Sequence, residues 1–212
     1  MEKEALIKYW VNSGLIKNKA VLNAFKKIPR EEFIPKQLHS QTYEDIPLPI
    51  YEKQTISQPT TVMLMTQDLE PKKGQKILEI GSGSGYQAAI LSEIIGKKGK
   101  IYTLEILPKL AKFARSNIKK LNIKNIEVIC ADGSKGYPKK APFDRIIVTA
   151  GAPEAPIPLI KQLKDKGILV IPIGPLYSQE MFKIVKDGPR LHIKKLGGFR
   201  FVPLLGKYGH KA

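Results

Sequence analysis

The chain has 212 residues, of which 42% are hydrophobic, and this length suits one domain with a substantial core. Its single cysteine, Cys130, excludes an intramolecular disulfide and a cysteine-based zinc cluster, and no apolar run approaches the roughly 18 residues of a membrane span. The formal net charge of +17 can attract nucleic acid, but the lysines are spread along the chain instead of forming one block.

Residues 4–50 precede the first strong strand, and their pattern predicts two short helices. Each helix has an apolar face at helical spacing, formed first by Ala5, Leu6, Tyr9 and Trp10 and then by Val21, Leu22 and Phe25. The amino-terminal residues lack the apolar core of a signal peptide, so we expect a cytoplasmic location. Residues 33–53 are rich in proline and aromatic side chains, which leaves two interpretations open: a cap over one edge of the core, or a lid over a substrate.

Residues 54–70, QTISQPTTVMLMTQDLE, change from a polar stretch to an apolar helical face. Ser57 or Thr60 can cap this helix, with Pro59 near its first turn. Met63 and Met65 are interpreted as core residues, since methionine fills irregular gaps between packed side chains.

Residues 76–86, KILEIGSGSGY, join a short apolar run to three glycines, and a helix-like stretch follows. This pattern predicts a buried strand that ends in a ligand-binding turn, where glycines let the backbone approach the ligand closely. The spacing is neither that of a phosphate-binding Walker loop nor that of the dinucleotide G-x-G-x-x-G motif. It resembles the E/D-x-G-x-G-x-G turn of class I S-adenosylmethionine-dependent methyltransferases.

Alternating strands and helices follow, and the last part of the chain changes to strands alone. The expected strands are residues 100–106, 126–131, 143–149 and 167–172, and the expected helices are residues 108–121 and 158–163. The apolar strand around Cys130 predicts a buried packing thiol. From residue 180 the alternation is that of strands, with a hairpin turn at Asp187 and Gly188.

This order predicts a doubly wound, Rossmann-like α/β fold with a mostly parallel seven-stranded sheet, an antiparallel C-terminal edge and an N-terminal helical cap. We expect one domain over residues 1–212. Its expected parts are a cap (1–53), a cofactor-binding core (54–175) and the C-terminal antiparallel strands (176–212).

Polar residues at the carboxyl ends of neighbouring strands complete the expected cofactor site, because ligands bind there in open α/β sheets. Glu105 lies about twenty residues after the last loop glycine, where a carboxylate can accept hydrogen bonds from both ribose hydroxyls. Asp132 can accept a hydrogen bond from an adenine amino group, and Gly133 leaves room for the ring. Each acid alone is typical of a solvated strand end. Together with the glycine loop they favour a cofactor site.

The acceptor of the methyl group is indicated by a different stretch, QTISQP at residues 54–59. The chain has no N/D-P-P-Y/F motif, which serves methylation of amino groups. A carboxylate acceptor is already ionised at neutral pH, so it needs hydrogen-bond donors rather than a general base. The hydroxyls of Thr55 and Ser57 and the amides of Gln54 and Gln58 are such donors, although a helix cap alone would also explain Ser57.

Segments along nearly the whole chain resemble the protein-L-isoaspartate (D-aspartate) O-methyltransferase family, and QTISQP and TAGAPEAPIPLIKQL carry the resemblance. It implies transfer of a methyl group from S-adenosyl-L-methionine, with S-adenosyl-L-homocysteine as product, to the α-carboxyl of isoaspartyl residues in damaged proteins and peptides. The ester then returns through a succinimide to aspartate. The implied cofactor-binding residues are Glu79, Ile80, Gly81, Ser82, Gly83, Gly85, Glu105, Ile106, Asp132 and Gly133. The implied substrate-binding residues are Gln54, Thr55, Ile56 and Ser57, with Ser57 as the catalytic residue.

Two departures from the family pattern stand beside this resemblance. The family reads P-I-G-x-G-Q-T-I-S, but here Tyr51 and Lys53 replace both glycines, which removes easy left-handed conformations before the substrate loop. Relatives often have a hydroxyl residue at the position of Leu205.

Two other functions remain open on the sequence alone. The basic charge allows an RNA-modifying methyltransferase of the same fold, and the lost glycines allow a cofactor-binding protein without catalysis. We expect no metal, because His39, His192 and His210 have no pattern of neighbouring ligands. We also expect a monomer that binds neither nucleic acid nor membrane.

Overall fold

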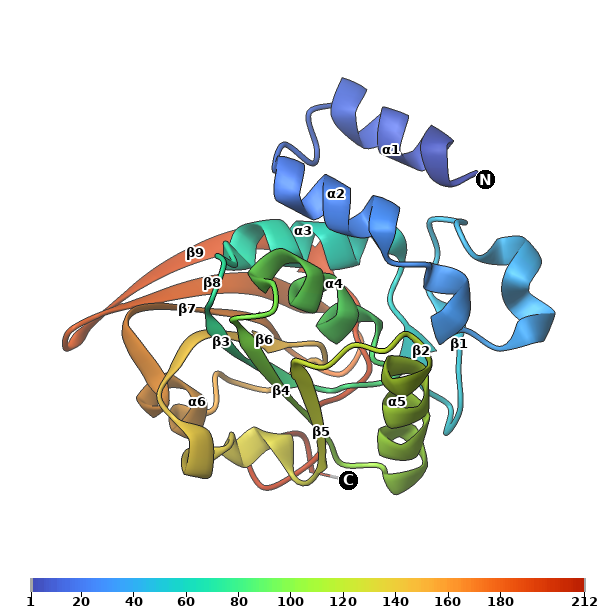
Figure 1. Cartoon of the computed structure of the whole chain (residues 1–212). Coiled ribbons are helices and arrows are strands. Elements are labelled where there is room, and N and C mark those ends of the chain that lie inside the picture. The colour runs from blue at the N-terminus through green and yellow to red at the C-terminus, as the bar shows by residue number, and fades with distance from the viewer. Residues whose placement is uncertain (1, 212) are drawn as a thin grey trace.

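The computed structural model describes residues 2–211 and has a twisted central sheet covered by helices on both faces (Figure 1). The amino-terminal part contains α1 (Lys3–Asn12), α2 (Lys19–Lys27), the 3₁₀ helices η1 (Arg30–Phe33) and η2 (Lys36–Gln41), the short strands β1 (Leu48–Pro49) and β2 (Thr55–Ile56), and α3 (Pro59–Leu69). The rest contains β3 (Lys76–Ile80), α4 (Tyr86–Ile95), β4 (Lys100–Glu105), α5 (Pro108–Lys120), β5 (Ile126–Cys130), η3 (Gly133–Lys135), η4 (Pro138–Lys140), β6 (Phe143–Val148), α6 (Ile157–Lys161), β7 (Leu163–Ile173), β8 (Gln179–Asp187) and β9 (Arg190–Phe199).

The central sheet has seven strands in the order β5-β4-β3-β6-β7-β8-β9. The first five are parallel to one another, and β8 and β9 are antiparallel and form a hairpin that projects beyond the helices (Figure 1). The chain runs outward from β3 in both directions, so the strand order reverses between β3 and β6. This confirms the predicted doubly wound fold and its antiparallel edge, and it places a ligand crevice at the carboxyl ends of β3 and β6.

Alternate residues of each parallel strand pack on opposite faces of the sheet, as the two-residue period of a strand requires. On β3, Ile77 belongs to a core cluster that includes residues of α3 and α4, whereas Leu78 belongs to a cluster on the other face that includes residues of α6. Both faces of β3 are therefore buried, which explains its nearly continuous apolar sequence.

The amino-terminal helices form a third core cluster above α3 and α4. Trp10 and Phe25 are fully buried there with their rings edge to face, and Phe33 joins them. The predicted face of α1 was wrong in part, because Ala5 and Tyr9 are exposed and the buried side chains are those of Leu6, Ile7 and Trp10. Phe33, Ile34 and Leu48 are buried in the same cluster, which supports the cap interpretation of residues 33–53.

Two local predictions were wrong because their outcome depends on distant parts of the chain. Cys130 is exposed rather than buried, since β5 is the edge strand of the sheet. Helix α3 begins after Gln58, and neither Ser57 nor Thr60 caps it. The cap comes instead from Asp45, whose carboxylate accepts hydrogen bonds from the Thr60 backbone N–H (2.9 Å) and hydroxyl (2.6 Å).

The hairpin between β1 and β2 turns at the two positions that follow Tyr51. Glu52 and Lys53 have φ values of 58° and 56°, and the Gln54 N–H donates to the Tyr51 carbonyl at 3.1 Å. Left-handed φ at both central residues is what a type I′ turn requires, and glycine or asparagine is preferred there. Lys53, at one of the two substituted glycine positions, therefore adopts a left-handed conformation despite its side chain. The turn is held against α5, where the Tyr51 ring meets Phe113 edge to face and Glu52 pairs with Lys109 at 2.9 Å.

We predict that Lys53→Gly raises the free energy of unfolding by up to about 1 kcal/mol. Relief of a left-handed side chain is worth roughly 1–2 kcal/mol, and the extra freedom of glycine in the unfolded chain offsets about half of it. Urea denaturation of both proteins measures the difference. Lys98→Gly is the matched control, because Lys98 is exposed in a turn without a positive φ, and its replacement is expected to lower stability. A lower stability of Lys53→Gly would contradict the strain argument.

Candidate active site

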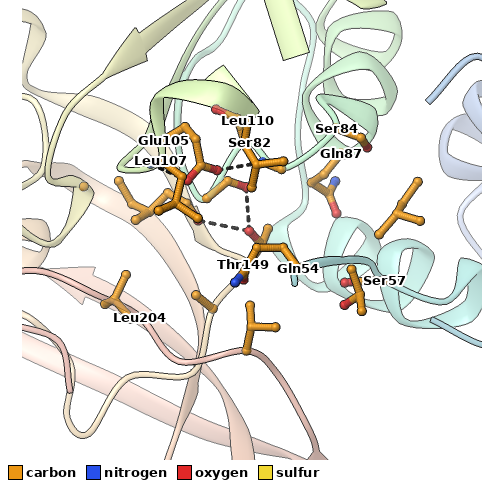
Figure 2. Close-up of a pocket in the computed structure, with 18 of the residues that line it drawn as sticks. Gln54, Ser57, Ser82, Ser84, Gln87, Glu105, Leu107, Leu110, Thr149 and Leu204 are labelled. Atoms are coloured by element: carbon orange, nitrogen blue, oxygen red, sulfur yellow. Dashed lines mark hydrogen bonds between the residues drawn. The ribbon is translucent and has the colours of Figure 1, made fainter. Parts of the chain in front are cut away.

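A cavity lies at the carboxyl ends of β3, β4 and β6, and its volume of about 890 Å³ includes space that is open to solvent. Four parts of the chain converge on it: the glycine loop after β3, the β4–α5 connection, the segment around β2 and the residues that follow β9 (Figure 2). The crevice predicted from the strand order is therefore a real cavity.

The glycine loop forms one wall, and its conformation depends on glycine. Gly81, Gly83 and Gly85 have φ values of 94°, 52° and 89°. A Cβ atom on Gly81 would lie 2.5 Å from the Thr149 hydroxyl oxygen, and that hydroxyl donates a hydrogen bond to the Gly81 carbonyl at 2.7 Å. Thr149 follows β6, so the two strands at the reversal point are tied together directly beneath the cavity.

Glu105 lines the same cavity from the end of β4. Its carboxylate accepts hydrogen bonds from the backbone N–H groups of Gly83 (2.9 Å) and Leu107 (3.1 Å) (Figure 2). Each carboxylate oxygen has a second acceptor site, which remains available for a ligand hydroxyl. Glu105 therefore fixes the glycine loop to β4 and still offers two acceptors to the cavity.

Most of the predicted cofactor residues come together here. Ile80, Gly81, Ser82, Gly83, Glu105, Ile106 and Gly133 all line the cavity. Gly85 begins α4 just behind the loop, where a Cβ atom would press on Ile118 at 3.3 Å.

Asp132 does not line the cavity, and its carboxylate is engaged elsewhere. It accepts hydrogen bonds from the Ser134 N–H (3.0 Å) and hydroxyl (2.6 Å) and from the Lys207 N–H (3.0 Å). Partial burial raises the pKa of Asp132, but these hydrogen bonds lower it by a larger amount. The net pKa therefore lies below the ordinary value of an aspartate. Asp132 thus ties the C-terminal segment to the end of β5, and its contact with a cofactor stays a prediction.

Glu79 also does not reach the cavity, because it is fully buried within the sheet. Neither carboxylate oxygen forms a hydrogen bond of normal geometry with residues 2–211. Burial raises the pKa of Glu79 to about 8; the nearby Thr103 hydroxyl opposes this shift, and the carboxylate of Glu105 adds to it. Glu79 is therefore largely protonated at neutral pH, and its predicted cofactor contact remains untested.

The predicted acceptor segment forms the opposite wall. Gln54, Thr55, Ile56 and Ser57 all line the cavity. In Figure 2, Ser57 lies across the cavity from Glu105, with Thr149 between them. Ser57, Thr55, Thr149 and Val202 also line a second, smaller groove beside the first. Ser57 therefore stands at the boundary between two hollows of the surface.

Arg30 holds the backbone at this boundary in place, and no sequence pattern predicted this role. Its guanidinium is fully buried and donates hydrogen bonds to the carbonyls of Thr42 (3.0 Å) and Ser57 (2.8 Å). It also lies over the Tyr86 ring, 5.1 Å from the centroid. No single residue pattern could reveal this, since the contacts join η1, the segment after η2, the acceptor loop and α4.

Other lining residues were also missed, and they come from α3, α4, α5 and the C-terminal segment. Met65, Gln87, Leu110, Val202 and Leu204 line the cavity. Leu205 lines it too, so the position where relatives often have a hydroxyl residue faces the site. Within residues 2–211, no group of three or more metal-ligating side chains lies together, and every helix is too short or too polar to cross a bilayer.

Comparison with known families agrees with this geometry. The sequence model of the protein-L-isoaspartate(D-aspartate) O-methyltransferase family matches residues 1–209. The chain is 46% identical over 217 residues to the protein-L-isoaspartate O-methyltransferase of Staphylothermus marinus, covering 99% of this chain and 96% of the relative. It is 48% identical over 206 residues to the same enzyme of Ignicoccus hospitalis, covering 96% and 97%.

Solved structures give the same result. A protein-L-isoaspartate O-methyltransferase superposes with a TM-score of 0.87 at 34% identity, covering 98% of this chain and 67% of its own. A Plasmodium falciparum protein assigned to the same activity by name superposes with a TM-score of 0.85 at 27% identity, covering 97% and 99%. That protein was crystallised in complex with S-adenosyl-L-homocysteine.

We predict that Glu79→Gln changes the pH dependence of stability. The folded-state pKa of about 8 lies above the ordinary value of 4.5, so the folded wild type holds a proton that the unfolded chain has lost between those pH values. Its free energy of unfolding therefore falls as the pH rises, by up to about 1.4 kcal/mol per pH unit.

The glutamine variant lacks this proton, so its stability relative to the wild type is expected to improve by a few kcal/mol between pH 5 and pH 8. Urea denaturation of the ligand-free proteins at several pH values measures the difference. Glu154→Gln, at an exposed position, controls for the loss of one negative charge. Parallel pH profiles of wild type and Glu79→Gln would show that Glu79 titrates normally.

Proposed function

Because the chain belongs to the protein-L-isoaspartate(D-aspartate) O-methyltransferase family, we propose that it repairs damaged proteins and peptides by methylating the α-carboxyl of L-isoaspartyl residues. The methyl donor is S-adenosyl-L-methionine. The ester formed returns through a succinimide to aspartate.

The charge of the cavity carries this proposal. The chain contains 36 lysines and arginines, yet none of them is among the residues that line the cavity within the described part of the chain. Its one charged lining residue is Glu105. A pocket for a phosphate-bearing nucleotide needs cations or a phosphate loop. A cavity with one carboxylate and no cation instead suits a positively charged sulfonium ligand with a ribose.

The residues present fit this cofactor. The glycine loop leaves backbone exposed where a Cβ atom would intrude, and Glu105 offers two free acceptor sites for the ribose hydroxyls. Gly133 and Ile106 line the part of the cavity near the ends of β4 and β5, which we assign to the adenine ring. Glu79 and Asp132 are proposed to support the cofactor site without lining the cavity. Glu79 lies in β3 directly before the glycine loop, and Asp132 holds the C-terminal segment through the Lys207 N–H.

The chain mainly has to align two reactants and exclude water. The cofactor supplies an activated methyl group. Ser57, Thr55 and Gln54 are proposed to hold one oxygen of the acceptor carboxylate, so that the other oxygen faces the methyl group. That oxygen gains the methyl group, the electron pair of the broken S–C bond stays on sulfur, and no proton moves. A general base is therefore not required, in agreement with a cavity lined by neither histidine nor cysteine among the described residues.

The alternative of binding without catalysis depended on the loss of two glycines before the acceptor loop. Lys53 nevertheless takes a left-handed φ of 56°, so a left-handed turn before Gln54 forms without glycine. We further propose a single methyltransferase domain over residues 1–212 that acts as a monomer in the cytoplasm without binding nucleic acid. The lone free cysteine and the spread of the lysines support this part of the proposal.

We expect methyl transfer to a peptide that contains isoaspartate and none to the matched aspartyl peptide. The isoaspartyl peptide has a free α-carboxyl, whereas the aspartyl peptide has a free side-chain carboxyl. The proposed acceptor wall is expected to place only the first of these against the methyl group. Methyl-labelled cofactor with each purified peptide measures the transfer. Equal labelling of both peptides, or labelling of RNA but of neither peptide, would overturn the proposed function.

We predict that Ser57→Ala lowers kcat by roughly ten- to hundredfold, because one oriented donor to the carboxylate is lost. Cofactor affinity, measured by calorimetry, is expected to stay within about twofold, since the glycine loop and Glu105 are unchanged. Ser178→Ala, at an exposed position away from the cavity, is the matched control. A kcat equal to that of the control would remove Ser57 from the mechanism.

A further inference from the structure

The groove beside the cavity differs from it in charge. The groove is lined by Pro47, Thr55, Ser57, Gln58, Thr61, Thr149, Arg200, Phe201 and Val202. Four of these residues, Thr55, Ser57, Thr149 and Val202, also line the main cavity, so the two hollows share a wall. Ser57 is part of that wall, so the groove gives a molecule access to Ser57 from the side opposite the cofactor cavity.

Arg200 is the charged residue of this groove, as Glu105 is of the cavity. Its side chain is exposed and has no hydrogen bond, ion pair or aromatic partner within residues 2–211. A guanidinium that forms no internal interaction is free to bind an anion, and its planar fork matches a carboxylate.

The backbone around Arg200 is held firmly, so the free guanidinium stands on a fixed base. The Phe201 N–H donates to the buried Gln179 side chain at 2.7 Å. The next residues pair with the end of β6, where the Gly151 N–H donates to the Val202 carbonyl at 2.8 Å and the Leu204 N–H donates to the Gly151 carbonyl at 2.7 Å. The same segment supplies Val202 and Leu204 to the cofactor cavity. The position of Arg200 relative to the cofactor is therefore set by the sheet.

We propose that Arg200 binds the acceptor carboxylate of the isoaspartyl residue as it enters the groove, and that this contact distinguishes substrate from methylated product. This inference rests on the proposed function. The substrate carboxylate carries one negative charge, whereas the methyl ester carries none. The attraction to Arg200 therefore exists before methyl transfer and is lost after it, which favours binding of substrate and release of product.

Arg200→Gln is expected to raise the KM for an isoaspartyl peptide by roughly tenfold, because a charge-assisted hydrogen bond is lost. The kcat and the cofactor Kd are expected to stay within about twofold, since Glu105, the glycine loop and Ser57 are untouched. Arg200→Lys keeps the charge but lacks the planar fork of the guanidinium. Its KM is expected to lie between those of the wild type and Arg200→Gln.

Arg190→Gln is the matched control for the general charge of the protein. Arg190 begins β9, the strand that leads to Arg200, is exposed, and lines neither hollow. If the overall positive charge alone attracts the peptide, both variants will raise KM equally, and that result would overturn the role of Arg200.

Product discrimination gives a second readout. Affinities for the isoaspartyl peptide and for its methyl ester are measured by calorimetry with S-adenosyl-L-homocysteine present, so that no turnover is needed. The wild type is expected to prefer the carboxylate by roughly tenfold, and Arg200→Gln is expected to lose most of that preference. An unchanged preference in the variant would overturn the inference. Failure of the wild type to methylate the peptide would instead overturn the proposed function.

Discussion

The geometry of the site depends on one buried cation. Arg30 has no carboxylate partner among the described residues, yet its guanidinium is fully buried. Burying a charge is costly unless hydrogen bonds compensate for it. Two carbonyls and an aromatic face offset part of that cost, while the Nη1 atom has no hydrogen-bond partner among the described residues. The carbonyls belong to Thr42 in the cap and to Ser57 in the acceptor loop, and the ring is that of Tyr86 at the start of α4. Cap, acceptor loop and cofactor helix are therefore held relative to one another, since a shift of any one would remove an interaction that the buried guanidinium forms.

Charge is distributed on the two sides of Ser57 in a way that suits the proposed reaction. Among the described residues that line them, the cavity has the carboxylate of Glu105 and no cation, and the groove has the guanidinium of Arg200 and no anion. A sulfonium and a carboxylate are each attracted to the side that the proposal assigns to them, and both lose their charge when the methyl group moves. The rest of the chain is rich in lysine, so the absence of lysine from the described lining of the cavity indicates a preference for a positively charged ligand.

The parts of this site that the sequence predicted are those encoded by short local patterns. An apolar run followed by glycines at Gly81, Gly83 and Gly85 specifies a strand and a tight turn with little regard to the rest of the chain. Glu105 was predicted because it ends a recognisable strand. The failures depend on partners far away in sequence: Cys130 is exposed because β5 lies at the sheet edge, and α3 is capped by Asp45. Arg30 was missed for the same reason, because its partners are brought together only by the fold.

The departure at residues 51–53 shows how the fold compensates for a local conflict. Left-handed φ at Glu52 and Lys53 is unfavourable for residues with side chains, and only surrounding contacts can maintain it. Some of those contacts lie within the hairpin, where Gln54 donates to the carbonyls of Tyr51 and Glu52. The others are with α5, through Phe113 and Lys109. The first turn of α5 also supplies Leu110 to the cavity wall, and Leu107 precedes it there. The strained turn therefore joins the acceptor loop to the helix that lines the cofactor side, a connection that two glycines would not provide. The loss of the glycines exchanges an intrinsically easy turn for one whose shape is set by α5.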